Sequence, residues 1–215
     1  MADPIRLDII SDPVCPWCYI GKANLERALA ERPDHPFAIE WHPFQLNPDM
    51  PREGADRASY LAEKFGGADK VKAAHERLAE VAAAAGLSID FDKVTRMANT
   101  LDAHRLIHWA GLEGRQGTVV SALFDAYWQK GLDIGSSEVL ADIAAEAGMD
   151  RAVVARLLES DADAAEISDR AAHSRARGVN GVPTFIVAER HAVSGAQPAD
   201  VWLSVIDELT EAQAQ

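Results

Sequence analysis

The order of strand-like and helix-like segments constrains the fold of this 215-residue chain more than any other feature. Apolar residues alternate over residues 5–10 and again over residues 37–41, as in β-strands, and residues 19–30 between them have helical spacing. A strand, a helix and a second strand in this order form a parallel βαβ unit. Near the end of the chain the pattern predicts two strands and a helix, at residues 184–187, 192–193 and 198–211. We therefore expect both ends of the chain to contribute to one sheet.

The middle of the chain is predicted to be helical. Runs rich in Ala, Glu and Lys, punctuated by glycines, indicate helices over residues 60–65, 71–85, 91–111, 118–130, 138–147, 153–158 and 162–177. No linker rich in Pro, Gly or Ser separates them from the ends. We predict an α/β protein in which residues 1–50 (βαβ) and 178–215 (ββα) form one domain. Residues 51–177 form a large all-helical insertion that packs closely on it.

The charge of the chain excludes several partners. The formal net charge is −13 at pH 7, so the basic patch that nucleic-acid binding requires is not expected, and anionic membranes would repel the protein. No apolar run reaches the roughly 20 residues that span a bilayer. Residues 1–8 carry charges where a signal peptide would have an apolar region. These features predict a cytoplasmic protein without nucleic-acid or membrane partners.

Two cysteines, Cys15 and Cys18, lie between the first predicted strand and the first predicted helix. This spacing places Cys15 at the helix N-terminus and Cys18 one turn later, and Pro16 suits the first turn because its missing N–H is not needed there. The positive end of the helix dipole favours a thiolate on Cys15, and the thiolate is the nucleophile in disulfide exchange. Cys15 would attack a substrate disulfide, and Cys18 would resolve the mixed disulfide. Trp17 would cover the thiol and shape the substrate surface.

Two other interpretations of the cysteine pair stay open at this point. A zinc site would need two further ligands, and the nearest histidines, His35 and His42, are too far apart in sequence for the usual spacing. His104 and His108 have helical spacing but lie far along the chain. The third interpretation is an inert buried pair. The strand–helix context favours redox chemistry over both, and we predict no metal site.

Four segments resemble a known family. They are residues 12–21 (DPVCPWCYIG), 99–106 (NTLDAHRL), 178–185 (GVNGVPTF) and 194–198 (SGAQP). Together they are similar to the FrnE-like branch of the DsbA family and span almost the whole chain. The resemblance implies a thioredoxin-like fold with an all-helical insertion covering the active site, and dithiol–disulfide exchange as the reaction.

The resemblance also implies roles for residues outside the cysteine motif. The Val182–Pro183 bond is expected to be cis and to lie against Cys15, with the Val182 backbone offered to an extended substrate. Asn99 and His104 would form polar contacts in the roof of the active site; the alternative is that they serve only internal packing. Pro16 and Trp17 would complete the substrate surface.

Related proteins suggest a second function. Kappa-class glutathione transferases and 2-hydroxychromene-2-carboxylate isomerases share the architecture, but they usually carry Ser at the place of Cys15. They also have an acidic pair where this chain has Gly195, Ala196 and Gln197. We therefore predict a disulfide oxidoreductase acting on a protein or a small thiol. It requires no cofactor, and glutathione is a candidate co-substrate. A glutathione-dependent isomerase or transferase is the alternative, a non-catalytic redox sensor is the third option, and the oligomeric state, with a homodimer as one option, stays open.

Overall fold

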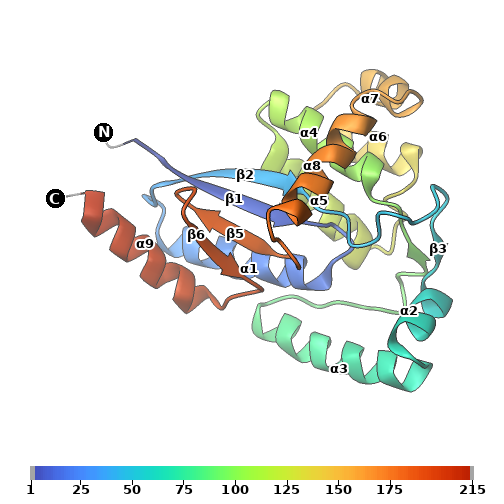
Figure 1. Cartoon of the computed structure of the whole chain (residues 1–215), viewed down its shortest axis with the longest axis horizontal. Helices are drawn as coiled ribbons and strands as arrows, with labels where there is room; N and C mark the ends of the chain where they lie inside the picture. Colours follow the sequence, from blue (N-terminus) through green and yellow to red (C-terminus); the bar gives the residue numbers. More distant parts are fainter. Residues whose placement is uncertain (1–2, 214–215) are drawn as a thin grey trace.

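A four-stranded sheet forms the centre of the computed structural model, which describes residues 3–213 (Figure 1). Its strand order is β2-β1-β5-β6. Strand β1 (Ile5–Ser11) pairs in parallel with β2 (Phe37–Pro43) and antiparallel with β5 (Thr184–Val187), which pairs with β6 (His191–Ser194). The prediction that both ends of the chain share one sheet is therefore confirmed.

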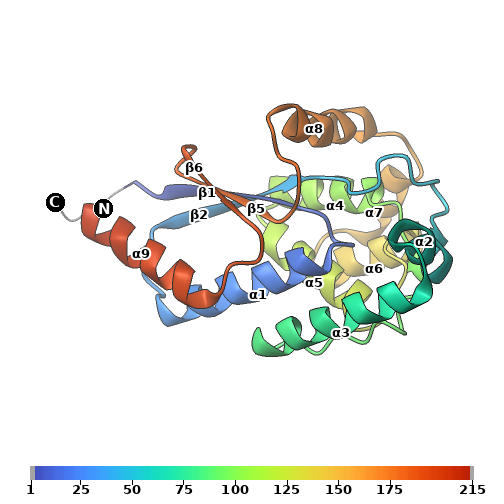
Figure 2. The same cartoon turned by 60° about the horizontal axis from the view of Figure 1, so that its bottom comes forward.

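Helices α1 (Pro16–Glu31) and α9 (Ala199–Gln213) lie on the same side of this sheet (Figure 2). Alternation along β1 places Leu7 and Ile9 in the core, where both are almost completely buried. In the predicted apolar stripe of the last helix, Trp202 and Ile206 are buried, and Val205 and Leu209 are half-buried. Its Trp202 meets Phe185 of β5 edge to face, with ring centroids 4.7 Å apart. Burial of these apolar faces holds α1 and α9 against the sheet.

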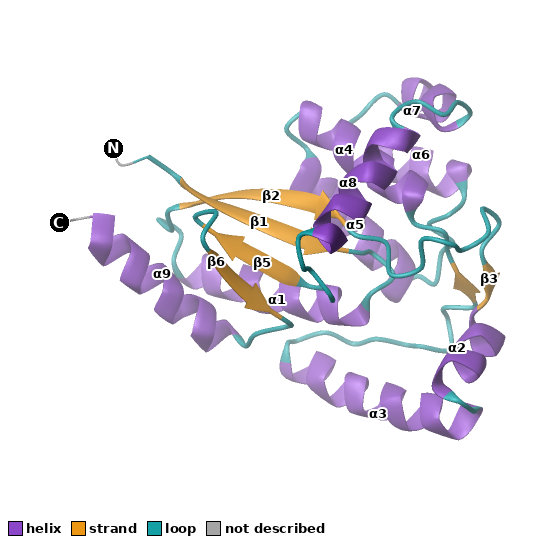
Figure 3. Cartoon of the chain, viewed as in Figure 1, coloured by secondary structure: helices purple, strands orange, loops and turns teal. Residues whose placement is uncertain are grey.

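The insertion gathers helices at the end of the sheet where β1 and β2 finish (Figure 3). They are α2 (Arg57–Phe65), α3 (Ala68–Ala84), α4 (Leu101–Leu112), α5 (Gln116–Trp128), α6 (Ser137–Glu146), α7 (Arg151–Leu158) and α8 (Ala164–Ala176). A two-stranded sheet of β3 (Ala55–Asp56) and β4 (Arg96–Met97) interrupts them. Within residues 3–213 we find no helix long and apolar enough to cross a membrane.

The prediction of one helix over residues 91–111 is wrong in its first ten residues. The helix begins only at Leu101, because the Asn99 side chain bonds both the start of the helix and a loop far back in the chain. Its Oδ1 accepts from the Leu101 N–H at 2.9 Å and its Nδ2 donates to the Met50 carbonyl at 2.7 Å. Val94 and Met97 are buried by tertiary contacts rather than along one helix face. The other predicted helices agree with the structure to within a few residues.

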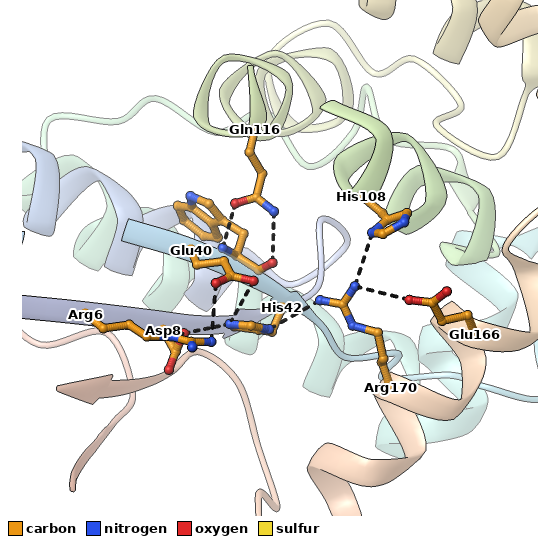
Figure 4. Close-up of polar contacts among 9 residues, drawn as sticks. Arg6, Asp8, Glu40, His42, His108, Gln116, Glu166 and Arg170 are labelled. Carbon is orange, nitrogen blue, oxygen red and sulfur yellow. Dashed lines mark hydrogen bonds and ion pairs between the residues drawn. The ribbon is translucent and has the colours of Figure 1, made fainter. Parts of the chain in front are cut away.

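Polar side chains fasten the insertion to the sheet (Figure 4). The amide of Gln116 bonds both backbone groups of Trp41, accepting at 2.9 Å and donating at 3.1 Å, on the outer edge of β2. Arg170 of α8 lies 3.5 Å from His42 of β2 and 3.2 Å from His108 of α4. These contacts fix the insertion beside the strand that precedes it.

Candidate active site

Backbone hydrogen bonds set the geometry of the cysteine loop. Cys15 is the N-cap of α1, and its N–H donates to the Asp12 carbonyl at 2.9 Å. The Cys18 N–H donates to the Cys15 carbonyl at 3.1 Å, which closes the first helical turn. The indole N–H of Trp128, from α5, donates to the Pro13 carbonyl at 3.0 Å. The insertion therefore contacts the cysteine loop through Trp128, and α1 fixes the spacing of the two thiols.

The two thiols are reduced and lie in different surroundings. Both side chains are buried, Cys15 at 3% exposure and Cys18 at 1%, so Cys15 is the more exposed by only a small margin. Burial, followed by its hydrogen bond with Cys15, raises the pKa of Cys18 well above the usual value. Cys18 therefore keeps its proton at neutral pH in the reduced protein.

The raised pKa of Cys18 predicts that the reduced protein loses stability in alkali. The folded state holds the Cys18 proton after the unfolded chain has lost it at about pH 8.5, so stability is complete below that pH and falls above it. We expect the free energy of unfolding to drop by up to about 1.4 kcal/mol per pH unit, before tyrosines ionise near pH 10. Urea unfolding under reducing conditions between about pH 7.5 and 9.5 measures this slope. Cys18→Ala is the control, and an equal slope in that variant contradicts the assignment.

The chain segment before β5 lies against the reactive thiol. The Val182–Pro183 peptide bond is cis, as predicted. The Cys15 thiol donates to the Val182 carbonyl oxygen, with Sγ and O 3.5 Å apart. Gly21 of α1 allows this close approach, since a Cβ there would come within 3.0 Å of the Pro183 ring. The structure thus brings together the predicted residues Cys15, Cys18, Val182 and Pro183.

Three other predicted residues take separate positions. Trp17 is 38% exposed on the first turn of α1. His104 is buried, and its Nε2 lies 3.1 Å from the Phe44 carbonyl oxygen. Asn99 holds the turn before α4 through the bonds described above. The hydrogen bonds of His104 and Asn99 go to internal backbone groups, which favours the packing alternative over contact with substrate.

Asp12 is the site residue that sequence reasoning missed. Its carboxylate is completely buried; Oδ2 accepts from the Leu46 N–H at 2.7 Å, and Oδ1 has no hydrogen-bond partner among the described residues. His104 Nε2 lies 3.7 Å from that oxygen. After burial and the bond to Cys15, the charge of Asp12 also contributes to the raised pKa of Cys18. An Asp before Pro is typical of a turn, so no local pattern indicates that this carboxylate is buried beside the thiols.

The histidines considered for a zinc site are engaged elsewhere. His42 lies 2.7 Å from Asp8, and the Phe37 N–H is 3.2 Å from the ring of His35. Residues 3–213 contain two groups of histidine and carboxylates close enough to share an ion, and neither includes a cysteine. They are Asp8, Glu40 and His42, and His108, Asp163 and Glu166. The geometry does not support a cysteine–histidine zinc site.

Comparisons with known proteins agree with this geometry. The model of the DSBA-like thioredoxin domain matches residues 6–207. A probable DsbA oxidoreductase from Streptomyces coelicolor is 31% identical and superposes with a TM-score of 0.83, covering 95% of this chain and 89% of that one. The uncharacterised protein YwbO of Bacillus subtilis (strain 168) is 27% identical, over 95% of this chain and 96% of its own length. These matches extend over nearly all of both chains.

Two solved structures, each 18% identical, share the fold. A 2-hydroxychromene-2-carboxylate isomerase superposes with a TM-score of 0.73, covering 97% of this chain and 98% of that one. The cytosolic disulfide reductase DsbM from Pseudomonas aeruginosa, solved with GSH, superposes with a TM-score of 0.68, covering 96% and 99%. The matched family model, the sheet and the cysteine motif agree. This chain therefore belongs to the family of DsbA-like thioredoxin domains and is an enzyme of the disulfide oxidoreductase or isomerase class.

Proposed function

We propose that this protein exchanges disulfides through Cys15 as nucleophile and Cys18 as resolving thiol. One observation carries the proposal: Cys15 stands at the N-terminus of α1 with its sulfur 3.5 Å from the Val182 carbonyl. The positive end of the α1 dipole lies at Cys15, whereas burial raises the pKa of Cys18 and keeps it protonated. The first attack therefore belongs to Cys15.

The reaction has two steps. The Cys15 thiolate attacks one sulfur of the substrate disulfide, forms a mixed disulfide and releases the other substrate sulfur as a thiolate. Cys18 then loses its proton and attacks the Cys15 sulfur, which forms the Cys15–Cys18 disulfide and releases the second substrate thiolate. Two electrons pass to the substrate, and the reverse sequence oxidises a dithiol. A substrate chain beside Val182 would be held in extended form.

The substrates belong to two classes in this proposal, disulfide-bearing proteins and small thiols. The sulfurs themselves carry both electrons, so the reaction requires no further cofactor. Glutathione is a fitting co-substrate, supported by the distant DsbM structure that contains GSH. We place the protein in the FrnE-like branch and in the cytoplasm, in line with the cytosolic reductase.

A glutathione-dependent isomerase is the weaker candidate. The isomerase structure shares the fold but is only 18% identical. In this chain the late turn is occupied by its own contacts. Asn24 donates to the Gln197 carbonyl at 3.0 Å, and the Gln197 side chain donates to the Ser194 carbonyl at 2.8 Å. The turn also has Gly195, Ala196 and Gln197 in place of the acidic pair expected of the isomerases.

Equilibration in glutathione redox buffers tests the proposal. We expect the Cys15–Cys18 disulfide to form reversibly, with loss of two thiols per chain. The measured potential assigns the direction, since about −270 mV indicates a reductant and about −120 mV an oxidant. The rate at which the protein accelerates the reduction of a protein disulfide by dithiothreitol measures its catalytic turnover. If Cys15 can be alkylated but neither reaction occurs, the proposal fails.

A further inference from the structure

A small cavity lies between the cysteine loop and helices α2 and α3. Its volume is about 140 Å³, and Val14 and Pro16 of the loop form one wall. Leu61, Phe65, Leu78 and Trp128 make most of the rest apolar. We call it the Arg57 cavity, after the guanidinium that also lines it. An apolar cavity of about 150 Å³ in another protein is large enough to hold benzene.

Arg57 is a buried cation without a counter-ion. The residue is 6% exposed, and its Nε has no hydrogen-bond partner. No carboxylate of residues 3–213 lies within 4.0 Å of its guanidinium. Its polar neighbours are uncharged: His75, whose Nε2 is 3.3 Å from Nη2, and the Tyr127 hydroxyl. Burial, and then the charge of Arg57, lower the pKa of His75, so this imidazole is neutral and does not balance the charge.

The chain satisfies its other fully buried guanidinium quite differently. Arg105 donates to Asp102 and to three backbone carbonyls at 2.6–2.8 Å. An unpaired buried charge is costly, and a buried donor left without a partner adds to that cost. Arg57, unlike Arg105, therefore has no anionic partner among the described residues.

The surroundings of Arg57 favour an anion. Its Cζ lies 5.8 Å from the Phe91 ring centroid and 5.6 Å from that of Trp128, so the guanidinium contacts two aromatic rings that also meet each other edge to face. Lys64 adds a second cation, held 3.1 Å from Asn47 Oδ1. None of the residues lining the cavity, all of them in the described chain, is acidic, although the protein has a net charge of −13. This is an apolar cavity with a local positive charge in an acidic protein.

We propose that the Arg57 cavity is a specificity pocket for a low-molecular-weight disulfide that carries a carboxylate on an apolar, ring-sized group. The carboxylate pairs with the guanidinium of Arg57 in a charge-assisted hydrogen bond, and the apolar group lies against Val14 and Pro16. Binding there places the disulfide beside the loop of Cys15, so that attack becomes effectively intramolecular. The inference rests on the proposed disulfide exchange and names its small substrate.

The test compares two aromatic disulfides that differ in the carboxylate. Reduced protein reacts with dithiobis(nitrobenzoate), which has a carboxylate on each ring, and with neutral dithiodipyridine. In each case the Cys15 thiolate forms a mixed disulfide, one aryl thiolate leaves, and Cys18 releases the second. The absorbance of the released aryl thiolate gives both rates. Their ratio is the readout, and it is compared only among variants that circular dichroism shows to be folded, because an unfolded chain exposes both buried thiols and reacts with each disulfide directly.

We expect Arg57→Met to lower this ratio about tenfold or more, the scale of a lost hydrogen bond to a charged group. Arg57→Lys, which keeps the charge, restores part of the ratio. Lys64→Gln at an exposed position lowers it about two- to threefold and carries the test if Arg57→Met does not fold. Arg77→Gln on α3 is the matched control, since this exposed arginine does not line the cavity and its loss changes the net charge equally.

The outcomes separate the two proposals. A ratio that is the same in wild type, Arg57→Met and Lys64→Gln overturns the specificity pocket. An equal fall in Arg77→Gln also overturns it, because the effect would then come from the overall charge. If wild-type protein reacts with neither disulfide, the proposed function fails, whatever the cavity binds.

Discussion

Replacing Cys15 with Ser abolishes disulfide exchange, whereas replacing Cys18 with Ser stops the reaction after its first step. A serine hydroxyl at the α1 N-terminus does not ionise near neutral pH, so the nucleophile is lost. We expect the exchange rate to fall on the order of 10³-fold or more, as after loss of other enzyme nucleophiles. Cys18→Ser keeps the Cys15 thiolate but has no resolving thiol, so it accumulates a mixed disulfide. Thiolate release and the intact mass of the protein measure the two steps.

The stoichiometry distinguishes the roles of the two thiols. Wild-type protein releases two aryl thiolates per chain from an aromatic disulfide, and Cys18→Ser releases one and gains the mass of the other. Cys15→Ser is the control for direct attack by Cys18, whose burial and high pKa make it slow. If Cys15→Ser forms the mixed disulfide as fast as Cys18→Ser, the assignment is reversed.

Replacing Arg105 with Met has the largest effect on stability that we expect outside the active site. Arg105 is completely buried; its Nη1 donates to Asp102 at 2.7 Å, and other donors reach the carbonyls of Ala162, Leu157 and Ser160. Methionine fills part of the space but leaves Asp102 and these carbonyls without their donors. We expect a loss of about 3–5 kcal/mol, the cost of breaking a buried charge pair. Urea unfolding measures this loss, provided that the unfolding free energy of both proteins depends on urea concentration with the same slope.

A surface arginine provides the matched control. Arg151 also lies 2.7 Å from its carboxylate, Asp142, but its side chain is 49% exposed. Water and salt screen this pair, so Arg151→Met should cost less than about 1 kcal/mol. Equal losses in Arg105→Met and Arg151→Met would show that the buried network adds no stability beyond a surface ion pair.

The elements that the sequence predicts well are those whose periodicity is local. Strand β1 and helix α9 each bury one face, which produces alternating or helical spacing of apolar residues. This spacing is visible within a short stretch of sequence. The position of Pro183 before β5 likewise indicated its place opposite Cys15, because the cysteine motif supplied the other half of the site.

The missed features depend on distant partners. Arg57 and Arg105 count as surface charges in any local pattern, and only the folded chain shows one without a counter-ion and the other surrounded by carbonyls. The turn at Asn99 needs the Met50 carbonyl, which comes from a loop far back in the chain. The contact between His104 and the Phe44 carbonyl likewise joins distant parts of the chain, so no pattern within the helix of His104 indicates it.

The pairing of β1 with β5 also determines when the sheet can form during synthesis of the chain. In the sheet Leu7 faces Val187, and Cys15 touches Val182, so neither contact can form until the segment that carries Val182 and β5 has left the ribosome. During synthesis β1 has β2 as its neighbour and an open edge on its other side, which is a site of aggregation in growing chains. The thiols are likewise uncovered in that period. The site around Cys15 is therefore incomplete in a nascent chain until β5 has been synthesised and has paired with β1.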